Sequence, residues 1–176
     1  VIHIRAPCRI IMEKKIFYSH LVWLFPAAFF FHICEEAPSF PFWVENVLKG
    51  HMDVRLFYVN NAAFMIVLLG LALFASRKRN FLSTFLLFLW VSGQQFWNFV
   101  FHLYTQFHFN AYSPGLWTAT FLYFPIFLYM SYLAIRESFL SWKALLFCVI
   151  AGAGGMWFTI WSGLYHFEEF PWASWI

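Results

Sequence analysis

The sequence predicts an all-α integral membrane protein, a bundle of five transmembrane helices. Two observations carry this prediction. The 176 residues are 62% hydrophobic and 25% aromatic but only 11% charged, with a mean hydropathy of +0.67. The charged residues are also confined to short segments between long apolar stretches. Because soluble domains carry about 25% charged residues, this composition excludes an ordinary soluble enzyme and a disordered chain.

The predicted transmembrane helices are five stretches of 19 to 24 residues that contain no Asp, Glu, Lys or Arg: 16–34, 57–76, 81–104, 116–135 and 144–164. About 20 apolar residues in a helix cross a hydrocarbon core roughly 30 Å thick. Each stretch meets this length, and short segments connect them. We therefore expect each stretch to span the membrane once.

The chain is divided into a cytoplasmic N-terminal extension at 1–15, a single transmembrane domain at 16–165 and an outer tail at 166–176. The segment Met12-Glu13-Lys14-Lys15 is typical of a natural start, so we interpret residues 1–11 as an extension without a structural role. The first apolar stretch is too long for the core of a secretory signal, and it lacks a small-residue cleavage site.

The basic residues predict the orientation, with the N-terminus in the cytoplasm and the C-terminus outside. Nine of the 11 basic residues then lie inside, and only Lys49 and Arg55 lie outside. We expect the protein in the cytoplasmic membrane, with the lipid bilayer as its main partner and an oligomer left open. A net charge of +3 without a basic stripe gives no reason to expect nucleic acid as a partner.

Two further segments have a predicted structural role. In the longest connection, 35–56, Pro41 is expected to open a short helix and Gly50 to close it, with an apolar side in the membrane interface. In the last stretch, the small residues 151–155 allow close approach between helices.

Polar residues within the apolar stretches indicate a functional site, because such groups are costly in a membrane. His32, Glu35 and Glu36 share one face at the end of the first stretch. A second polar face follows in the third stretch, formed by Gln94, Gln95, Asn98 and His102. Both histidines lie toward the outer surface on helices that run in the same direction. We therefore expect them to face each other at similar depth.

The fourth stretch follows Tyr112-Ser113-Pro114-Gly115. Ser113 is expected to cap the helix, and Pro114 fits its first position. Gly115 lacks a side chain, so a substrate or another part of the protein can come close there. Tyr112 would hold its hydroxyl near the interface.

The order of these motifs resembles the HXXEE family. The family is marked by its name motif, here His32-x-x-Glu35-Glu36, by a second histidine, here His102, and by a YXPG motif, here Tyr112-x-Pro114-Gly115. The resemblance spans roughly residues 16–135. It implies that these seven residues matter together, in a family that is uncharacterised and suspected to be enzymatic.

Two chemistries suit these residues. In the first, His32, Glu36 and His102 bind a divalent metal, zinc or iron, and a metal-bound water becomes a nucleophile near neutral pH. In the second, no metal is bound, and a glutamate and a histidine act as acid and base in an isomerase or cyclase. The expected catalytic residues are His32, Glu35, Glu36, His102 and Tyr112. The residues expected to shape the site or contact substrate are Gln95, Asn98, Pro114 and Gly115.

A site within the outer leaflet favours a lipid or isoprenoid-like substrate, and hydrolysis, isomerisation and cyclisation all fit. Two further classes remain open, a transporter of protons or cations and a non-catalytic membrane partner. The same residues also fit a purely structural interpretation, without any catalytic or transport function. The carboxylates could be solvated at a helix end, and His102 with Asn98 could make an interhelical hydrogen bond worth about 0.6 kcal/mol.

Overall fold

The computed structural model describes residues 18–166, and its regular elements there are all helical. The first elements are α2 (Leu24–Glu36), α3 (Phe40–Trp43), η1 (Val44–Leu48) and α4 (Val54–Lys78). One continuous rod follows, made of α5 (Phe81–Val91), the π-helical turn η2 (Ser92–Trp97) and α6 (Asn98–Phe109). The last two rods are α7 (Leu116–Thr118) with η3 (Ala119–Tyr123) and α8 (Phe124–Arg136), and α9 (Trp142–Ile160) with η4 (Trp161–Tyr165).

Three of these helices are long and apolar enough to cross a membrane: Val54–Lys78, Leu116–Arg136 and Trp142–Tyr165. They coincide with three of the five predicted stretches. The first predicted stretch is interrupted by a turn at Val22 and Trp23, because Pro26 has no N–H to donate to the carbonyl of Val22. The third stretch is a continuous helix, but the polar residues of η2 and α6 lower its mean hydropathy.

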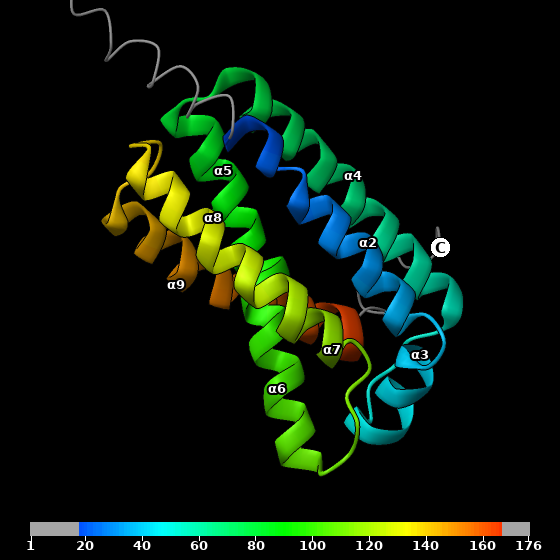
Figure 1. Cartoon of the computed structure of the whole chain (residues 1–176). Coiled ribbons are helices and arrows are strands. Elements are labelled where there is room, and N and C mark those ends of the chain that lie inside the picture. Colours follow the sequence, from blue (N-terminus) through cyan, green and yellow to red (C-terminus); the bar gives the residue numbers. More distant parts are fainter. Residues whose placement is uncertain (1–17, 167–176) are drawn as a thin grey trace, which may run out of the picture.

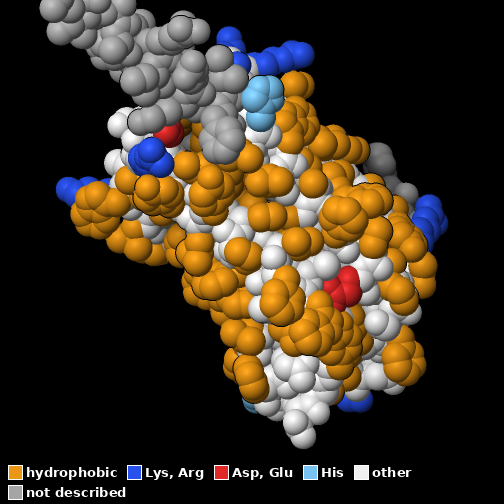
Figure 2. All heavy atoms as spheres, viewed as in Figure 1, with side chains coloured by type: hydrophobic (Ala, Val, Ile, Leu, Met, Phe, Trp, Pro, Cys, Tyr) orange, Lys and Arg blue, Asp and Glu red, His pale blue; other side chains and the backbone are white. Residues whose placement is uncertain are grey.

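The surface of the described residues is unusually apolar, as expected for a protein surrounded by lipid. More than thirty large hydrophobic side chains are exposed, among them Phe107 at 77%, Ile66 at 70% and Trp157 at 65%. Figure 2 shows hydrophobic side chains over most of the visible face, with the Lys and Arg side chains toward its margins. This distribution is the one that a hydrocarbon solvent favours. The predicted segment 1–15, and the predicted tail apart from His166, lie outside the described residues.

The core is centred on the rod α5–η2–α6, against which α4, α8 and α9 pack (Figure 1). Phe88 is fully buried between Phe25 and Phe127. The expected close approach of small residues occurs at Gly152, where an added Cβ would lie 2.7 Å from the backbone nitrogen of Gly93. Glycine at 152 therefore permits this crossing, and a Cβ at Gly93 would lie only 3.1 Å from the carbonyl oxygen of Gly152.

Short polar caps end the helices and fix the connections. The amide of Leu56 donates to Asp53 at the start of α4, that of Ser83 to Asn80 at the start of α5, and that of Ala144 to Ser141 at the start of α9. The predicted short helix of the first connection is present as α3 and η1, with Pro41 near its start. Its end differs from the prediction, because Lys49 and not Gly50 takes the left-handed conformation.

The end of α2 and the short helix α7 lie together, and α7 also packs against α6 (Figure 1). The loop 110–115 leaves α6 and returns to α7, which packs against both α2 and α6. The chain thereby brings the HXXEE segment of α2, the second histidine on α6 and the YXPG loop into contact. These are the three motifs singled out in the sequence.

Candidate functional site

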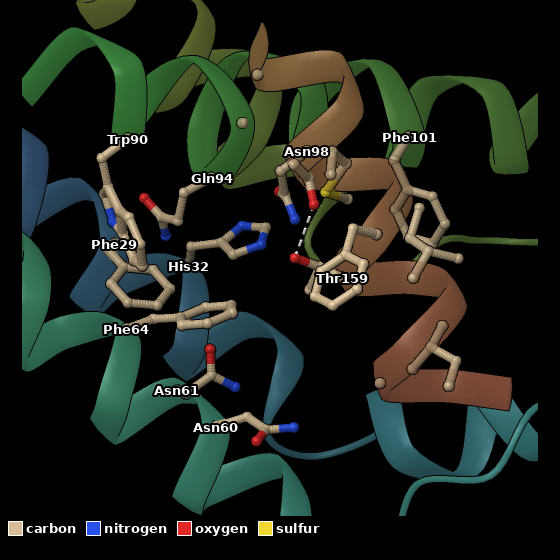
Figure 3. A pocket seen from close by; sticks show the side chains of 18 of the residues that line it. Phe29, His32, Asn60, Asn61, Phe64, Trp90, Gln94, Asn98, Phe101 and Thr159 are labelled. Carbon is tan, nitrogen blue, oxygen red and sulfur yellow. Dashed lines mark hydrogen bonds between the residues drawn. The ribbon is translucent and has the colours of Figure 1, made fainter. Parts of the chain in front are cut away.

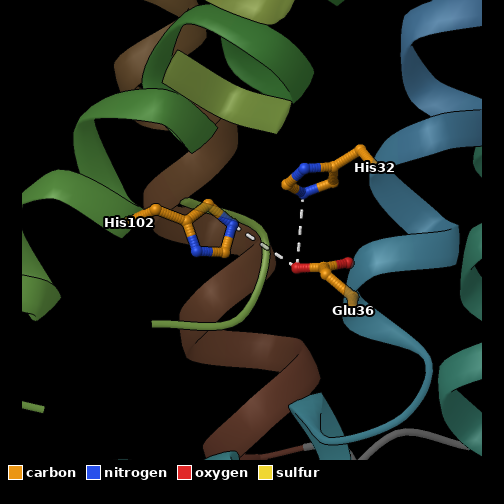
Figure 4. A group of neighbouring side chains, drawn as sticks. All are labelled: His32, Glu36 and His102. Atoms are coloured by element: carbon orange, nitrogen blue, oxygen red, sulfur yellow. Dashed lines mark ion pairs between the residues drawn. The ribbon is translucent and has the colours of Figure 1, made fainter. Parts of the chain in front are cut away.

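Three buried side chains from α2 and α6 converge beside α7. His32 and His102 are 1% and 0% exposed, and Glu36 is 5% exposed. Nε2 of His32 lies 3.3 Å from Oε1 of Glu36, and Nε2 of His102 lies 3.4 Å from the same oxygen (Figure 4). All three potential ligand atoms lie within 4.8 Å of one another. One carboxylate oxygen is thus shared between two imidazole nitrogens.

These distances suit a metal ion bound between the three atoms. In a tetrahedral zinc site with bonds of about 2.0–2.1 Å, neighbouring ligand atoms are separated by about 3.3–3.4 Å. Two imidazole nitrogens and one carboxylate oxygen are a donor set that zinc and non-haem iron accept, with positions left for water or substrate. The residues present therefore fit a divalent ion of either kind.

The hydrogen bonds of His32 place its ring proton on Nδ1. The Thr118 hydroxyl donates to Oε2 of Glu35 at 2.6 Å, so its oxygen is left to accept. Nδ1 of His32 lies 2.8 Å from that oxygen and is therefore the donor. In the neutral ring Nε2 then carries a lone pair and faces Glu36.

The ring proton of His102 is placed on Nδ1 in the same way, by a different pair of hydroxyl groups. Thr105 donates its hydroxyl to the backbone carbonyls of Phe101 and His102, at 2.9 and 3.2 Å. Its oxygen therefore accepts from Ser113, 3.0 Å away, and the Ser113 oxygen accepts from Nδ1 of His102 at 3.0 Å. Nε2 of His102 is again the atom with the lone pair.

Two imidazole lone pairs and a carboxylate oxygen thus face one another in a buried space. Neither Nε2 makes a hydrogen bond within the described part of the chain. Electron-pair donors this close repel one another unless a cation or extra protons lie between them. Ring nitrogens fixed through hydrogen bonds on the opposite side are also typical of histidines that bind metals.

Gly115 packs directly against both histidine rings. Its φ is +99°, a conformation that favours glycine. A Cβ there would lie 2.6 Å from Cε1 of His32 and 2.9 Å from Cε1 of His102. The expected close approach is therefore made by the two histidines, which explains why a glycine loop accompanies them.

Glu35 lies beside the cluster but holds the backbone instead. It accepts hydrogen bonds from the amides of Gly115, Trp117 and Thr118, at 3.2, 3.1 and 2.7 Å. The Tyr112 hydroxyl donates to it at 2.6 Å. Burial and then this hydrogen bond raise the pKa of Tyr112 above its usual range. Glu35 therefore fastens the end of α2 to the start of α7.

This arrangement corrects the expected helix start. Ser113 was expected to cap the fourth helix and Pro114 to open it, but the helix begins at Leu116 with Gly115 before it and no capping by Ser113. The physical reason is that Glu35 already binds the free amides of this helix. Ser113 is thereby free to bind His102, and Pro114 is buried in the loop.

The remaining predicted site residues do not lie together in the structure. Gln95 is fully buried and donates through Nε2 to the carbonyl of Phe25 at 2.9 Å, which joins η2 to α2. Asn98 instead lines a cavity beside the histidine cluster. Tyr112 is 49% exposed and contacts Glu35. The structure thus brings His32, Glu36 and His102 together and leaves Gln95 and Tyr112 in contacts elsewhere.

The cavity has a volume of about 490 Å³. His32 and Glu36 form part of its wall, whereas His102 does not. The other polar side chains that line it are Asn60, Asn61, Gln94, Asn98 and Thr159, and the rest of the lining is apolar or glycine. Figure 3 shows His32, Gln94 and Asn98 directed into the same space. The volume is within the usual range for small-molecule sites, about 300–1,000 Å³.

Several neighbours of the site could not be singled out from sequence. Thr118 and Ser113 are ordinary residues in a sequence, and only their hydrogen bonds reveal what they do. The ring of Tyr123 lies 4.5 Å from that of His32. One weak signal exists, since π-helical turns often mark functional sites, and η2 and η3 carry Gln94 and Tyr123. Helical periodicity alone does not reveal such turns.

The comparisons with known proteins agree with the motifs. The family model for a protein of unknown function with an HXXEE motif matches residues 23–130, more than half of the chain. Comparison with curated proteins and with solved structures gave no match. The matched range contains the histidine cluster, the Glu35 contacts and the YXPG loop. The chain belongs to the HXXEE family.

Proposed function

We propose that this protein is a membrane-embedded, metal-dependent enzyme that acts on a lipid or isoprenoid-like substrate. The observation that carries the proposal is the shared contact of His32 and His102 with one oxygen of Glu36, with both Nε2 lone pairs directed inward by hydroxyl partners. Zinc or iron would be held by these three residues, with positions left for water or substrate. Such an ion would supply Lewis-acid polarisation of a substrate oxygen.

The rest of the site supports a small-molecule reaction. The cavity next to His32 and Glu36 is large enough for a substrate. Its wall is mainly aromatic and aliphatic, and a few amides can orient a polar group. Hydrolysis of a lipid ester or amide begins with the polarisation of such a group.

The proposal includes five membrane spans with the N-terminus in the cytoplasm. Beyond the three long apolar helices, the rod α5–η2–α6 and the broken helix that ends with α2 would cross with their polar faces turned inward. Support comes from the burial of Gln95, His102 and His32 on these two helices. In this orientation the candidate metal centre lies in the extracytoplasmic leaflet.

The proposal is tested by metal analysis of the purified protein. After loading with zinc or iron(II) and removal of free metal, wild type should retain about one ion per chain. His32→Ala and His102→Ala should each lose most of it, because two remaining ligands bind weakly. His108→Ala is the matched control, since His108 is an exposed histidine on the same helix as His102.

The outcome separates the two chemistries. Retention of metal by His32→Ala and His102→Ala at the wild-type level would refute the proposed centre. If wild type bound no ion after loading, the acid–base alternative with Glu36 and the histidines would replace it. Proton or cation flux through vesicles containing the protein, with no turnover of any lipid, would instead identify a transporter.

A further inference from the structure

We propose that the cavity beside the metal centre binds one uncharged, single-chain lipid, which enters from the membrane between α4 and α9. This inference rests on the proposed function and adds the class and route of the substrate. It is carried by the shape of the cavity, by its chemistry and by which of its walls are open. Each can be read from the lining residues.

The cavity extends along the last rod. Its lining residues on the last rod run from Ala151 to Leu164, a distance of roughly 20 Å at 1.5 Å per residue. A volume of about 490 Å³ over this length suits one extended hydrocarbon chain. A two-chain phospholipid would need a wider space.

The polar groups of the wall suit an uncharged head. No Lys or Arg lines the cavity in the described part of the chain, and the carboxylate of Glu36 does, so a phosphate group would lack the usual basic partners and would lie near a like charge. The side-chain amides of Gln94 and Asn98 instead offer donors and acceptors next to His32. A hydroxyl, aldehyde, ester or amide head would bind here, with its oxygen near the metal centre.

Apolar side chains close the cavity at the end nearest to the short helix. Phe40, Met52, Phe57 and Leu164 line it there and belong to one buried cluster. The segment that carries Met52 is fastened to η4, since the amide of His51 donates to the carbonyl of Leu164 at 2.7 Å. The hydroxyl of Tyr165 also donates to the carbonyl of Leu48 at 2.9 Å. Among the described residues, this end of the cavity is therefore lined by buried apolar side chains, which disfavour entry of water-soluble molecules.

The side of the cavity on α9 reaches the lipid-facing surface. Gly155 and Phe158 both line the cavity and are exposed. On the opposite side, Asn61 and Phe64 of α4 line it and are half-buried. α4 and α9 each pack against α5, and the cavity lies between them. A chain dissolved in the bilayer can thus enter sideways.

Gly155 controls this entrance. A Cβ added there meets no atom within 4 Å, so a large side chain would occupy the mouth without disturbing the helices. Gly154 is a matched control, because it is equally exposed and open but does not line the cavity. Gly163 lines the cavity and is also open, which provides a second blocking position.

The test uses a 16-carbon primary alcohol with a diazirine at mid-chain, in phosphatidylcholine nanodiscs that contain the full chain. After irradiation, mass spectrometry should find adducts concentrated on lining residues such as Met156 and Phe64. Gly155→Trp and Gly163→Trp should reduce these adducts about tenfold or more, and Gly154→Trp should leave them unchanged. The phosphate ester of the same alcohol should label the lining weakly.

Two results would overturn the inference. One is equal labelling of the cavity in Gly154→Trp, Gly155→Trp and Gly163→Trp, with the three variants equally folded by thermal melting. The other is stronger labelling by the phosphate ester. His102→Ala separates this inference from the metal centre, because His102 does not line the cavity. That variant should lose metal and keep its adducts, whereas Gly155→Trp should keep metal and lose its adducts.

Discussion

At the scale of single residues, the candidate site depends on hydroxyl groups that do not themselves face the proposed metal position. Thr118 and Ser113 accept the Nδ1 protons of His32 and His102 and thereby turn both Nε2 lone pairs toward Glu36. They are positioning residues. Because metal-bound histidines lose affinity for the ion when such partners are removed, their contribution can be measured.

Thr118→Val should weaken metal binding about 10- to 100-fold, the usual effect of removing such a partner. The valine has nearly the shape of threonine but cannot accept the proton of His32. Thr118→Ser keeps the hydroxyl and should restore binding to near the wild-type level. Calorimetric zinc titration of the three proteins checks this, and equal affinity in wild type and Thr118→Val would contradict the role of the hydroxyl.

Gly115→Ala should abolish metal binding and destabilise the fold. The left-handed backbone costs a non-glycine residue about 1–2 kcal/mol, and the new Cβ would also lie 2.6 Å from the His32 ring. Gly70→Ala in α4 is the control, since an added Cβ there meets no atom within 4 Å and alanine favours a helix. Thermal melting and metal content report the two effects, and a Gly115→Ala protein that melts and binds metal like Gly70→Ala would refute the packing argument.

At the scale of elements, the important contact joins the end of α2 to the start of α7. Glu35 accepts several hydrogen bonds across this contact. A carboxylate placed at the positive end of a helix dipole is stabilising. The two adjacent glutamates therefore have different roles, Glu35 in joining helices and Glu36 in facing the histidines.

Glu35→Gln should lower the melting temperature, because an amide cannot accept all of these hydrogen bonds. Metal should still bind in this variant, although more weakly, since Thr118 loses its acceptor. Glu36→Gln should show the opposite pattern: it should lose metal binding, and its melting temperature should fall less than that of Glu35→Gln. If the two variants behaved alike, the division of roles between the glutamates would be wrong.

Tyr112→Phe tests the same contact through pH. The pKa of Tyr112 is raised in the folded protein, so its stabilising effect is complete below the unfolded value of about 10 and is lost as pH rises above it. Melting temperatures of wild type should therefore fall more steeply than those of Tyr112→Phe above pH 10. Parallel curves over that range would contradict the raised pKa.

The elements also show what sequence can predict. Charge-free stretches located the long helices, because hydropathy and length are local properties. His32, Glu36 and His102 were grouped correctly, since two parallel helices with polar ends at similar depth leave few other arrangements. The start of α7 was predicted wrongly because Glu35, some 80 residues away, replaces the expected cap. Gln95 and Gln94 lie next to each other in the sequence, and only the π-helical η2 decides which one lines the cavity.

At the scale of the whole molecule, the proposed orientation would place the proposed metal centre on the extracytoplasmic side. Cys34 lies beside this centre and is exposed, and Lys143 is an exposed residue at the start of α9. In intact cells an impermeant thiol reagent should label Cys34. A cysteine placed at Lys143, in a chain with Cys8, Cys34 and Cys148 replaced by serine, should be labelled only after permeabilisation. The reverse pattern would invert the topology.

The central claim, that His32, Glu36 and His102 hold one divalent ion, is tested most directly by X-ray absorption of the zinc-loaded protein. We expect a first shell of nitrogen and oxygen at about 2.0–2.1 Å with the scattering of two imidazoles, reduced to one imidazole in any zinc that His102→Ala retains. A wild-type spectrum without imidazole scattering, or an identical spectrum from His102→Ala, would show that the ion is held elsewhere.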